Sequence, residues 1–230
     1  MMPSQSSLEN TIEEQIRRWE IEKRKKYKNP IRPVITLSRL PGALGGDLAR
    51  KLAHDLNLDL FDQEIVERIS ADDTVGRQIV ESLDEQDRSV FDEWISALGE
   101  DHRSSYEYLQ RLTNVVAAIG THGYAVIVGR GAGFILPKEV SLRVLVTAPL
   151  GTRIRNVMRR YGAAEAEAAR QIMRTESERK AFIRKYFHAD LTDPVNYDLV
   201  VNTENIDVDL AAATIKEIFN SRRWYAYSPQ

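Results

Sequence analysis

The chain has 230 residues, of which 43% are hydrophobic and 29% are charged, and its formal net charge is −2. This length suits one sizeable α/β domain, and the near-neutral charge argues against a general nucleic-acid-binding protein. Without cysteine, neither a disulfide nor a Cys-ligated zinc site can form. No apolar run is long enough to span a bilayer. We therefore expect a cytoplasmic protein that binds neither nucleic acid nor membrane.

The first predicted element is a charged amphipathic helix over residues 8–28. Four apolar residues recur at helical spacing and share one face: Leu8, Ile12, Ile16 and Trp19. The face is narrow, so we expect it to dock on the main domain or on a second copy of the chain, which would give a homodimer. Glutamates on this segment, among them Glu13, Glu14, Glu20 and Glu22, make a basic membrane-surface helix the weaker alternative. Prolines end this extension, which we place at residues 1–32.

Five short apolar runs separated by helical patterns predict a parallel sheet in the rest of the chain. The predicted strands span residues 34–37, 58–61, 124–129, 142–148 and 197–203. Strands that are apolar on both faces lie inside a sheet with helices on both sides. The predicted fold is therefore a three-layer α/β/α domain over residues 33–222, followed by a tail at 223–230. The carboxyl ends of all strands then meet at one edge, where such sheets bind ligands.

Helical patterns fill the segments between these strands. The predicted helices span residues 47–56, 62–71, 76–98, 105–120, 149–162, 163–187 and 207–221. Between Arg153 and Lys185, ten basic residues face only four glutamates, a local excess of +6. Such a field suits an anionic ligand. Arg–Glu pairs at helical spacing are the alternative interpretation for most of the ten.

A glycine-rich turn joins the first strand to the next helix in the stretch ITLSRLPGALGGDLARKLA. Loops of this layout bind phosphates through backbone N–H groups and the positive end of the following helix. The candidate phosphate-binding residues are Ser38, Arg39, Gly42, Ala43, Leu44, Gly45, Gly46 and Asp47. The usual motif has a lysine and a hydroxyl residue where this chain has Gly45 and Gly46. Arg39 is the basic residue left on the loop to substitute for the lysine, and a tight turn without a ligand is the alternative.

Six stretches, taken in order, resemble the cytidylate kinase-like family of P-loop proteins, which are relatives of the nucleoside monophosphate kinases. They are ITLSRLPGALGGDLARKLA, LFDQEIVERI, AVIVGRGAGFILP, LRVLVTAPLGTRIRNVMRRYG, RTESERKAFIRKYF and YDLVVNT. The resemblance implies a P-loop NTPase fold with a helical acceptor-binding region at 62–122 and a lid region at 150–187. The N-terminal helix is then an addition to that fold.

The resemblance implies ATP-dependent phosphoryl transfer to a nucleoside monophosphate, such as CMP or dCMP, or to a similar small phosphorylated acceptor. The family loop reads roughly Ser-Arg-x-x-Gly-Ser-Gly-Gly-Arg and so also lacks the lysine. This chain departs further, because Leu44 replaces a glycine and Gly46 replaces the arginine. With its degenerate P-loop, a non-catalytic nucleotide-binding regulatory or interaction module is the alternative function.

The resemblance also implies roles for residues outside the loop. Arg130 matches the arginine of an Asp-Gly-Arg-Asp motif that contacts the acceptor phosphate, while Val128 and Gly131 replace its aspartates. A guanidinium suits a phosphate because it donates two parallel hydrogen bonds. Asp62 and Arg68 have the spacing of an acceptor-binding segment. Asp62 equally suits a helix N-cap, and Arg68 suits a helix surface.

Arginines of the lid complete the implied site. Arg174 and Arg179 match lid arginines that close over the transferring phosphoryl group, although Arg174 and Glu178 also suit an i, i+4 pair. Asn202 ends the last strand, where related folds place the donor base. Because the aspartates are lost, we expect no protein metal site and expect Mg²⁺ to arrive bound to ATP.

Overall fold

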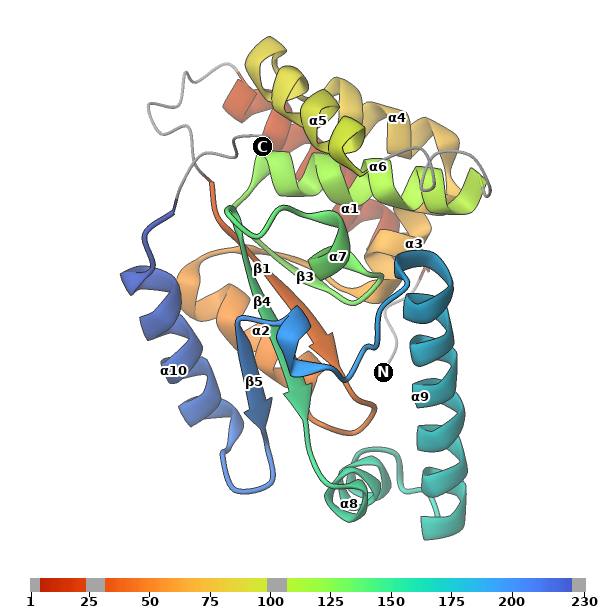
Figure 1. Cartoon of the computed structure of the whole chain (residues 1–230). Coiled ribbons are helices and arrows are strands. Elements are labelled where there is room, and N and C mark those ends of the chain that lie inside the picture. Colours follow the sequence, from red (N-terminus) through yellow and green to blue (C-terminus); the bar gives the residue numbers. More distant parts are fainter. Residues whose placement is uncertain (1–4, 24–31, 99–106, 225–230) are drawn as a thin grey trace.

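The computed structural model describes residues 5–23, 32–98 and 107–224 (Figure 1). Its centre is a five-stranded parallel sheet with the strand order β2-β3-β1-β4-β5. The strands are β1 (Val34–Arg39), β2 (Asp59–Phe61), β3 (Ala125–Val128), β4 (Ser141–Thr147) and β5 (Leu199–Asn202). In the central strand, Ile35 lies opposite Val126 of β3 and Leu142 of β4. The predicted α/β fold with a five-stranded parallel sheet is confirmed.

Helices cover both faces of the sheet. They are α1 (Gln5–Lys23), α2 (Gly45–Leu56), α3 (Gln63–Ala71), α4 (Asp73–Glu81), α5 (Glu85–Ala97), α6 (Glu107–His122), α7 (Ala132–Ile135), α8 (Leu150–Tyr161), α9 (Glu165–Phe187) and α10 (Val208–Ser221). Helices α2 and α10 pack on one face, whereas α6 and α7 pack on the other and carry α3, α4 and α5. The arrowheads of β1, β4 and β5 point toward α8 in Figure 1. Within the described residues, no helix is both long and apolar enough to cross a membrane.

Strand side chains alternate between two hydrophobic cores. Val126 and Val128 of β3 pack in the core with α2 and α10, whereas Ala125 and Ile127 pack in the core with α6. Successive side chains of a strand point to opposite faces, so a strand covered on both sides is apolar at most of its positions. This is why the sequence shows short continuous apolar runs.

The prediction of one helix over residues 76–98 is wrong. The structure has two helices there, because α4 ends at Glu81 and α5 begins at Glu85. The Asp84 carboxylate accepts a hydrogen bond of 2.8 Å from the N–H of Asp87 and so caps α5. Leu83 lies in the break and is buried in the core. Apolar residues continue at helical spacing on both sides of the break, and this hides it in the sequence.

Helix α1 docks on the main domain through its apolar face. Ile12 and Trp19 are buried, and the Trp19 ring stacks on His122 with centroids 3.9 Å apart and planes 4° apart. Gln15 donates a hydrogen bond of 2.6 Å to Asp59, the first residue of β2. Strand β2 is an edge strand, and helix packing beside it protects such an edge from pairing with other chains.

Of the two docking partners expected for this helix, the structure therefore shows the main domain. Residues 24–28 of the predicted helix and most of the predicted tail lie outside the described residues. A homodimer through α1 stays a prediction, as do the domain boundaries.

We predict that Trp19→Ala lowers the free energy of unfolding by about 3–5 kcal/mol, because it removes a buried ring from the contact between α1 and α6. Ile21→Ala is the control on the same helix, since Ile21 is 52% exposed, and its cost should stay within about 0.5 kcal/mol. Urea denaturation followed by circular dichroism measures both. Equal small effects would mean that α1 is not docked in solution.

Candidate functional site

The glycine-rich loop between β1 and α2 is held by bonds to its carbonyl groups. Asn156 of α8 donates to the carbonyl of Gly42 at 2.9 Å, and the Thr203 hydroxyl donates to that of Ala43 at 3.1 Å. In a trans peptide the C=O and the following N–H point in opposite directions. The N–H of Leu44, which follows the Ala43 carbonyl, therefore points away from Thr203. Ala43 itself is buried, and its N–H donates to the carbonyl of Leu40.

The N-terminus of α2 carries no side-chain cap. Its N-cap residue is Leu44, in a left-handed conformation (φ 61°, ψ 15°), and no side chain accepts from the first-turn N–H groups. The N–H of Asp47 donates to the carbonyl of Leu44 at 3.1 Å, but those of Gly45 and Gly46 have no preceding helical carbonyl to donate to, and the helix dipole adds a partial positive charge at this end. The start of α2 is thus chemically suited to bind a phosphate oxygen.

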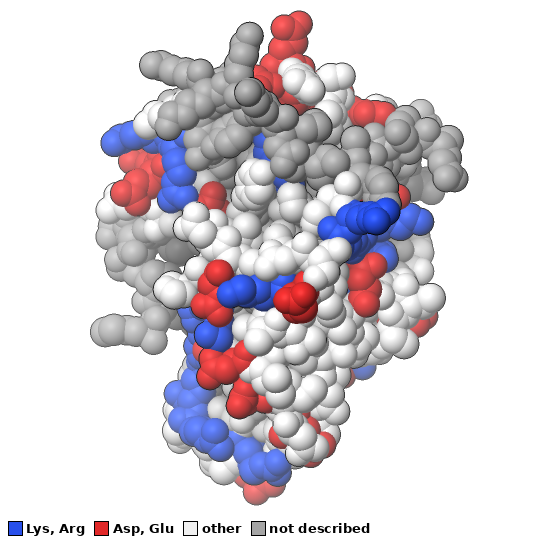
Figure 2. Space-filling model, turned by 90° about the vertical axis from the view of Figure 1, so that its left-hand side faces the viewer, with Lys and Arg blue, Asp and Glu red and all other residues white. Residues whose placement is uncertain are grey.

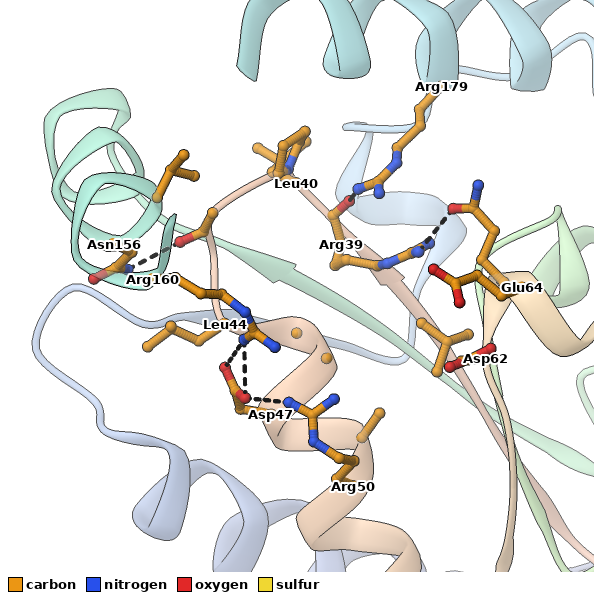
Figure 3. A pocket seen from close by; sticks show the side chains of 18 of the residues that line it. Arg39, Leu40, Leu44, Asp47, Arg50, Asp62, Glu64, Asn156, Arg160 and Arg179 are labelled. Atoms are coloured by element: carbon orange, nitrogen blue, oxygen red, sulfur yellow. Dashed lines mark hydrogen bonds and ion pairs between the residues drawn. The ribbon is translucent and has the colours of Figure 1, made fainter. Parts of the chain in front are cut away.

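Asp47, in the first turn of α2, connects the loop to α8. Its carboxylate forms ion pairs with Arg160 of α8, at 3.0 Å, and with Arg50 one turn along α2 (Figure 3). A carboxylate here repels a phosphate, so these two cations neutralise a charge that would otherwise oppose binding. Asp47 therefore positions Arg160 beside the loop.

Three arginines from distant parts of the chain converge at the carboxyl end of the sheet. Arg39 ends β1, Arg130 follows β3 and Arg179 lies on α9. Arg179 donates to the backbone carbonyl of Arg39 at 2.9 Å, as Figure 3 shows. The side chain of Arg39 donates to the Gln63 amide oxygen, also at 2.9 Å.

The electrostatics of this cluster favour an anion. Burial, together with the like charges of Arg179 and Arg130, lowers the pKa of Arg39 to about 9, so its guanidinium is still charged at neutral pH. Burial also lowers the pKa of Arg130 and, with the Arg130 charge, that of Arg179. A lowered pKa means that each positive charge is held at a cost. A phosphate bound among the three removes that cost.

Two cavities meet at this cluster. We call the larger one, of about 430 Å³, the loop pocket: it is lined by the glycine-rich loop, the start of α2, α8 and Asp62. We call the smaller one, of about 200 Å³, the arginine pocket: it is lined by Ser38, the turn at Arg130, and α9. Arg39, Gln63 and Arg179 line both cavities, so they form the wall between them.

Arg130 adopts an unusual backbone conformation. Its φ is 51°, between Gly129 (φ 78°) and Gly131 (φ 72°). A left-handed non-glycine residue costs about 1–2 kcal/mol and, where it occurs, points to a functional constraint. Its guanidinium lies over the Phe182 ring and forms an ion pair with Glu67. Its Nε is buried and has no hydrogen-bond partner among the described residues.

Gln63 and Glu67 of α3 are site residues that the sequence motifs do not predict. Gln63 bonds Arg39 through its oxygen and donates to the Glu67 carboxylate at 3.1 Å, and Glu67 pairs with Arg130. One short chain of contacts therefore joins two of the three arginines. The only sequence signal is their i, i+4 spacing just after a predicted strand end.

The other predicted site residues lie in different places. Asp62 lines the loop pocket and also caps α3, accepting from Ile65 N at 3.0 Å. Arg68, in the last turn of α3, lines neither pocket. Arg174 lies on the exposed side of α9, 3.9 Å from Glu178. Asn202 ends β5, and its side chain accepts from the N–H of Glu204 outside both pockets. Their predicted roles stay predictions.

Positive charge surrounds the site on the lid side. Helix α8 carries Arg153, Arg155, Arg159 and Arg160 and no acidic residue. Lys and Arg side chains gather at the lower end of the molecule in Figure 2, where α8 lies in Figure 1. Arg153 is buried, donates to the carbonyl of Ala148 and pairs with Glu176, so it joins α8 to α9. The described residues contain no cluster of three His, Cys, Asp or Glu that could hold a metal.

Comparison with known proteins identifies the family. The model of the cytidylate kinase-like family matches residues 34–205, from β1 to just beyond β5. The chain belongs to this family. The cytidylate kinase of Ignicoccus hospitalis is 26% identical over 185 residues, which cover 80% of this chain and 98% of that protein. The cytidylate kinase of Aeropyrum pernix is 26% identical over 173 residues, covering 75% of this chain and 91% of that protein.

The family match confirms the predicted resemblance and places α1 before the matched region, since the match begins at Val34. Among solved structures, an uncharacterized protein from Eubacterium ventriosum superposes with a TM-score of 0.59 at 22% identity. That similarity covers 83% of this chain and 99% of the other, and it concerns the fold alone.

We predict that Glu67→Gln raises the affinity for CMP by about threefold to tenfold, because it removes a partly exposed carboxylate that competes with phosphate for Arg130. Isothermal titration calorimetry measures the change. Glu85→Gln removes the same charge from the exposed start of α5 and serves as the control. A weaker affinity in Glu67→Gln would instead mean that Glu67 orients Arg130 for binding.

Proposed function

We propose that this protein transfers a phosphoryl group from ATP to a nucleoside monophosphate, such as CMP or dCMP, or to a similar small phosphorylated acceptor. The observation that carries the proposal is the convergence of Arg39, Arg130 and Arg179 around two adjoining cavities, of which Arg39 and Arg179 line both and Arg130 lines the smaller. Membership of the cytidylate kinase-like family supports it, as do the names of the relatives from Ignicoccus hospitalis and Aeropyrum pernix.

The loop pocket is the donor site in this proposal. The N–H groups at the start of α2 would bind the phosphates of ATP, and Arg160 stands at the rim on α8. The donor set fits the anionic nucleotide better than a bare cation. Asp47 is already paired, and the other carboxylates that line the pocket, Asp62 and Glu64, form no metal-binding cluster with it. Mg²⁺ would be carried by ATP, and it would neutralise part of the phosphate charge.

The arginine pocket is the acceptor site. Arg130 has a planar fork of donors that matches a phosphate, and its Nε lacks a hydrogen-bond partner among the described residues. Arg179 reaches the same region from α9, the long helix of the lid region. Donor and acceptor would therefore lie on opposite sides of the wall that Arg39 and Gln63 form.

Phosphoryl transfer depends on substrate positioning and on positive charge more than on acid–base catalysis. The moving group carries negative charge on its oxygens, and fixed cations stabilise that charge most in a site that excludes water. One well-placed arginine accelerates such reactions by about 10³-fold or more. Three arginines held by hydrogen bonds and packing thus suit the reaction without the usual loop lysine.

A non-catalytic nucleotide-binding module is the second candidate function. It is favoured by Gly45 and Gly46, which stand where the phosphate-binding lysine and the Mg²⁺-binding hydroxyl are usual. Such a module would bind nucleotides at the same pockets without turnover.

A coupled assay with ATP, Mg²⁺ and each nucleoside monophosphate tests the proposal. We predict measurable transfer by the wild type and a loss of about 10²-fold or more in kcat/KM for Arg130→Ala. Arg170→Ala, on the exposed surface of α9, is the control and should keep wild-type activity. Tight nucleotide binding without transfer to any acceptor would favour the non-catalytic module instead.

A further inference from the structure

We propose that Arg39 takes over the role of the missing loop lysine on the transferring phosphoryl group, and that Gly45 and Gly129 are glycines because they make room for it. The proposal rests on the function proposed above and assigns a further catalytic residue to it. It explains why the loop has lost its lysine while the site keeps a cation at the same strand end.

Gly45 occupies the position where the usual motif has its lysine. A Cβ on Gly45 would lie 2.6 Å from Cβ and 3.0 Å from Cγ of Arg39. Non-bonded Cβ atoms are essentially never 2.6 Å apart, and the Cβ of Arg39 is attached to the backbone and cannot swing away. With this backbone, a side chain at position 45 therefore excludes any side chain at position 39, that of Arg39 included.

Gly129 makes room for the other end of the same side chain. A Cβ there would lie 2.1 Å from Nη1 and 3.2 Å from Cζ of Arg39, and Gly129 has a positive φ of 78°. The guanidinium thus lies against the backbone that follows β3, with its Nη1 nearest to Gly129. Two glycines, 84 residues apart in the numbering of the chain, fit around one arginine.

Arg39 forms no ion pair with the described residues, and the carboxylate of Asp62 acts on its charge only from a longer distance. Its side chain has a hydrogen bond to the neutral amide of Gln63. Burial lowers the pKa of Arg39, so the folded protein holds this charge at a cost. A buried arginine with a purely structural role is usually paired with a carboxylate. An arginine that binds phosphate instead keeps its charge available for the ligand.

The position of Arg39 fits the transferring group better than either substrate alone. Its side chain lines both the loop pocket and the arginine pocket, whereas Arg130 lines only the arginine pocket. The phosphoryl group moves from the donor to the acceptor and so must cross the wall that Arg39 forms. A guanidinium there contacts the γ-phosphate of ATP and has no contact to make with ADP.

The experiment compares single and paired variants by kcat and by the affinities for ATP and ADP. We expect Arg39→Ala to lower kcat by about 10²-fold or more while ADP affinity stays within about threefold, and Arg39→Lys to recover part of the loss. Gly45→Ala should lose at least about tenfold more activity than Gly46→Ala. These two are matched, because a Cβ at Gly46 meets only the end of Arg50, at 3.8 Å.

The double variant Arg39→Gly/Gly45→Lys is the most informative comparison. It removes the Arg39 Cβ that a side chain at position 45 would meet and places a lysine at the usual position of the motif, so we expect at least about tenfold more activity than in Arg39→Gly alone. Gly45→Lys by itself should be at least as inactive as Gly45→Ala. Circular dichroism and thermal melting confirm that each variant is folded.

The failure of this inference differs from the failure of the proposed function. If Arg39→Ala keeps kcat within about threefold of wild type while Arg130→Ala is inactive, the role of Arg39 is overturned and the function stands. If the wild type transfers no phosphate, the proposed function is wrong, and the role of Arg39 is then tested by the nucleotide affinities. The inference survives there only if Arg39→Ala weakens ATP binding at least about tenfold more than ADP binding.

Discussion

A charged guanidinium enclosed at the carboxyl end of a parallel sheet constrains every loop around it. Arg39 can lie there only because Gly45 and Gly129 carry no side chain. Its orientation is fixed by Gln63, and its backbone carbonyl accepts from Arg179 of the lid region. Loops after β1 and β3, the start of α3 and the middle of α9 are thereby tied to one residue. A change at any of these points alters the same charge.

In the proposed function, this arrangement would give the phosphate site a different chemistry from a lysine loop. A lysine is a compact charge on a flexible stem, whereas an arginine is a rigid fork that orients what it binds. Because Arg39 is held before any ligand arrives, little reorganisation is needed when charge moves between the pockets. In the protein without ligand, burial disfavours the charged forms of Arg39, Arg130 and Arg179, and this lowers the stability of the fold. Ligand binding and stability should therefore be linked in this protein.

Much of the fold follows from the sequence because the strands are buried on both faces. Runs such as Ala125–Val128 have no polar position and are separated by helical patterns, which together indicate a parallel sheet. The break between α4 and α5 cannot be predicted from the sequence, because the apolar spacing continues past Leu83. The capping residue, Asp84, has the pattern of any exposed acidic residue. For α1 the sequence predicts docking on either the main domain or a second copy of the chain. It does not distinguish them, because an apolar face does not indicate which surface covers it.

The candidate site was predictable in its location but not in its contacts. Parallel strands bring their carboxyl ends to one edge, so Arg39 and Arg130 were expected to meet. The clash that links Gly45 to Arg39, and the ion pair between Glu67 and Arg130, depend on side-chain positions that no spacing rule gives. Arg174 and Arg179 illustrate the same limit: both are lid arginines in the sequence, yet only Arg179 lines the pockets.

A crystal structure with a non-hydrolysable ATP analogue, Mg²⁺ and CMP tests the central claim most directly. We predict that the γ-phosphate lies within hydrogen-bond distance of the Arg39 guanidinium and that the CMP phosphate contacts Arg130. The remaining ATP phosphates should lie at the N-terminus of α2. A structure in which both substrates bind while Arg39 keeps Gln63 as its only partner, remote from every phosphate, would contradict it.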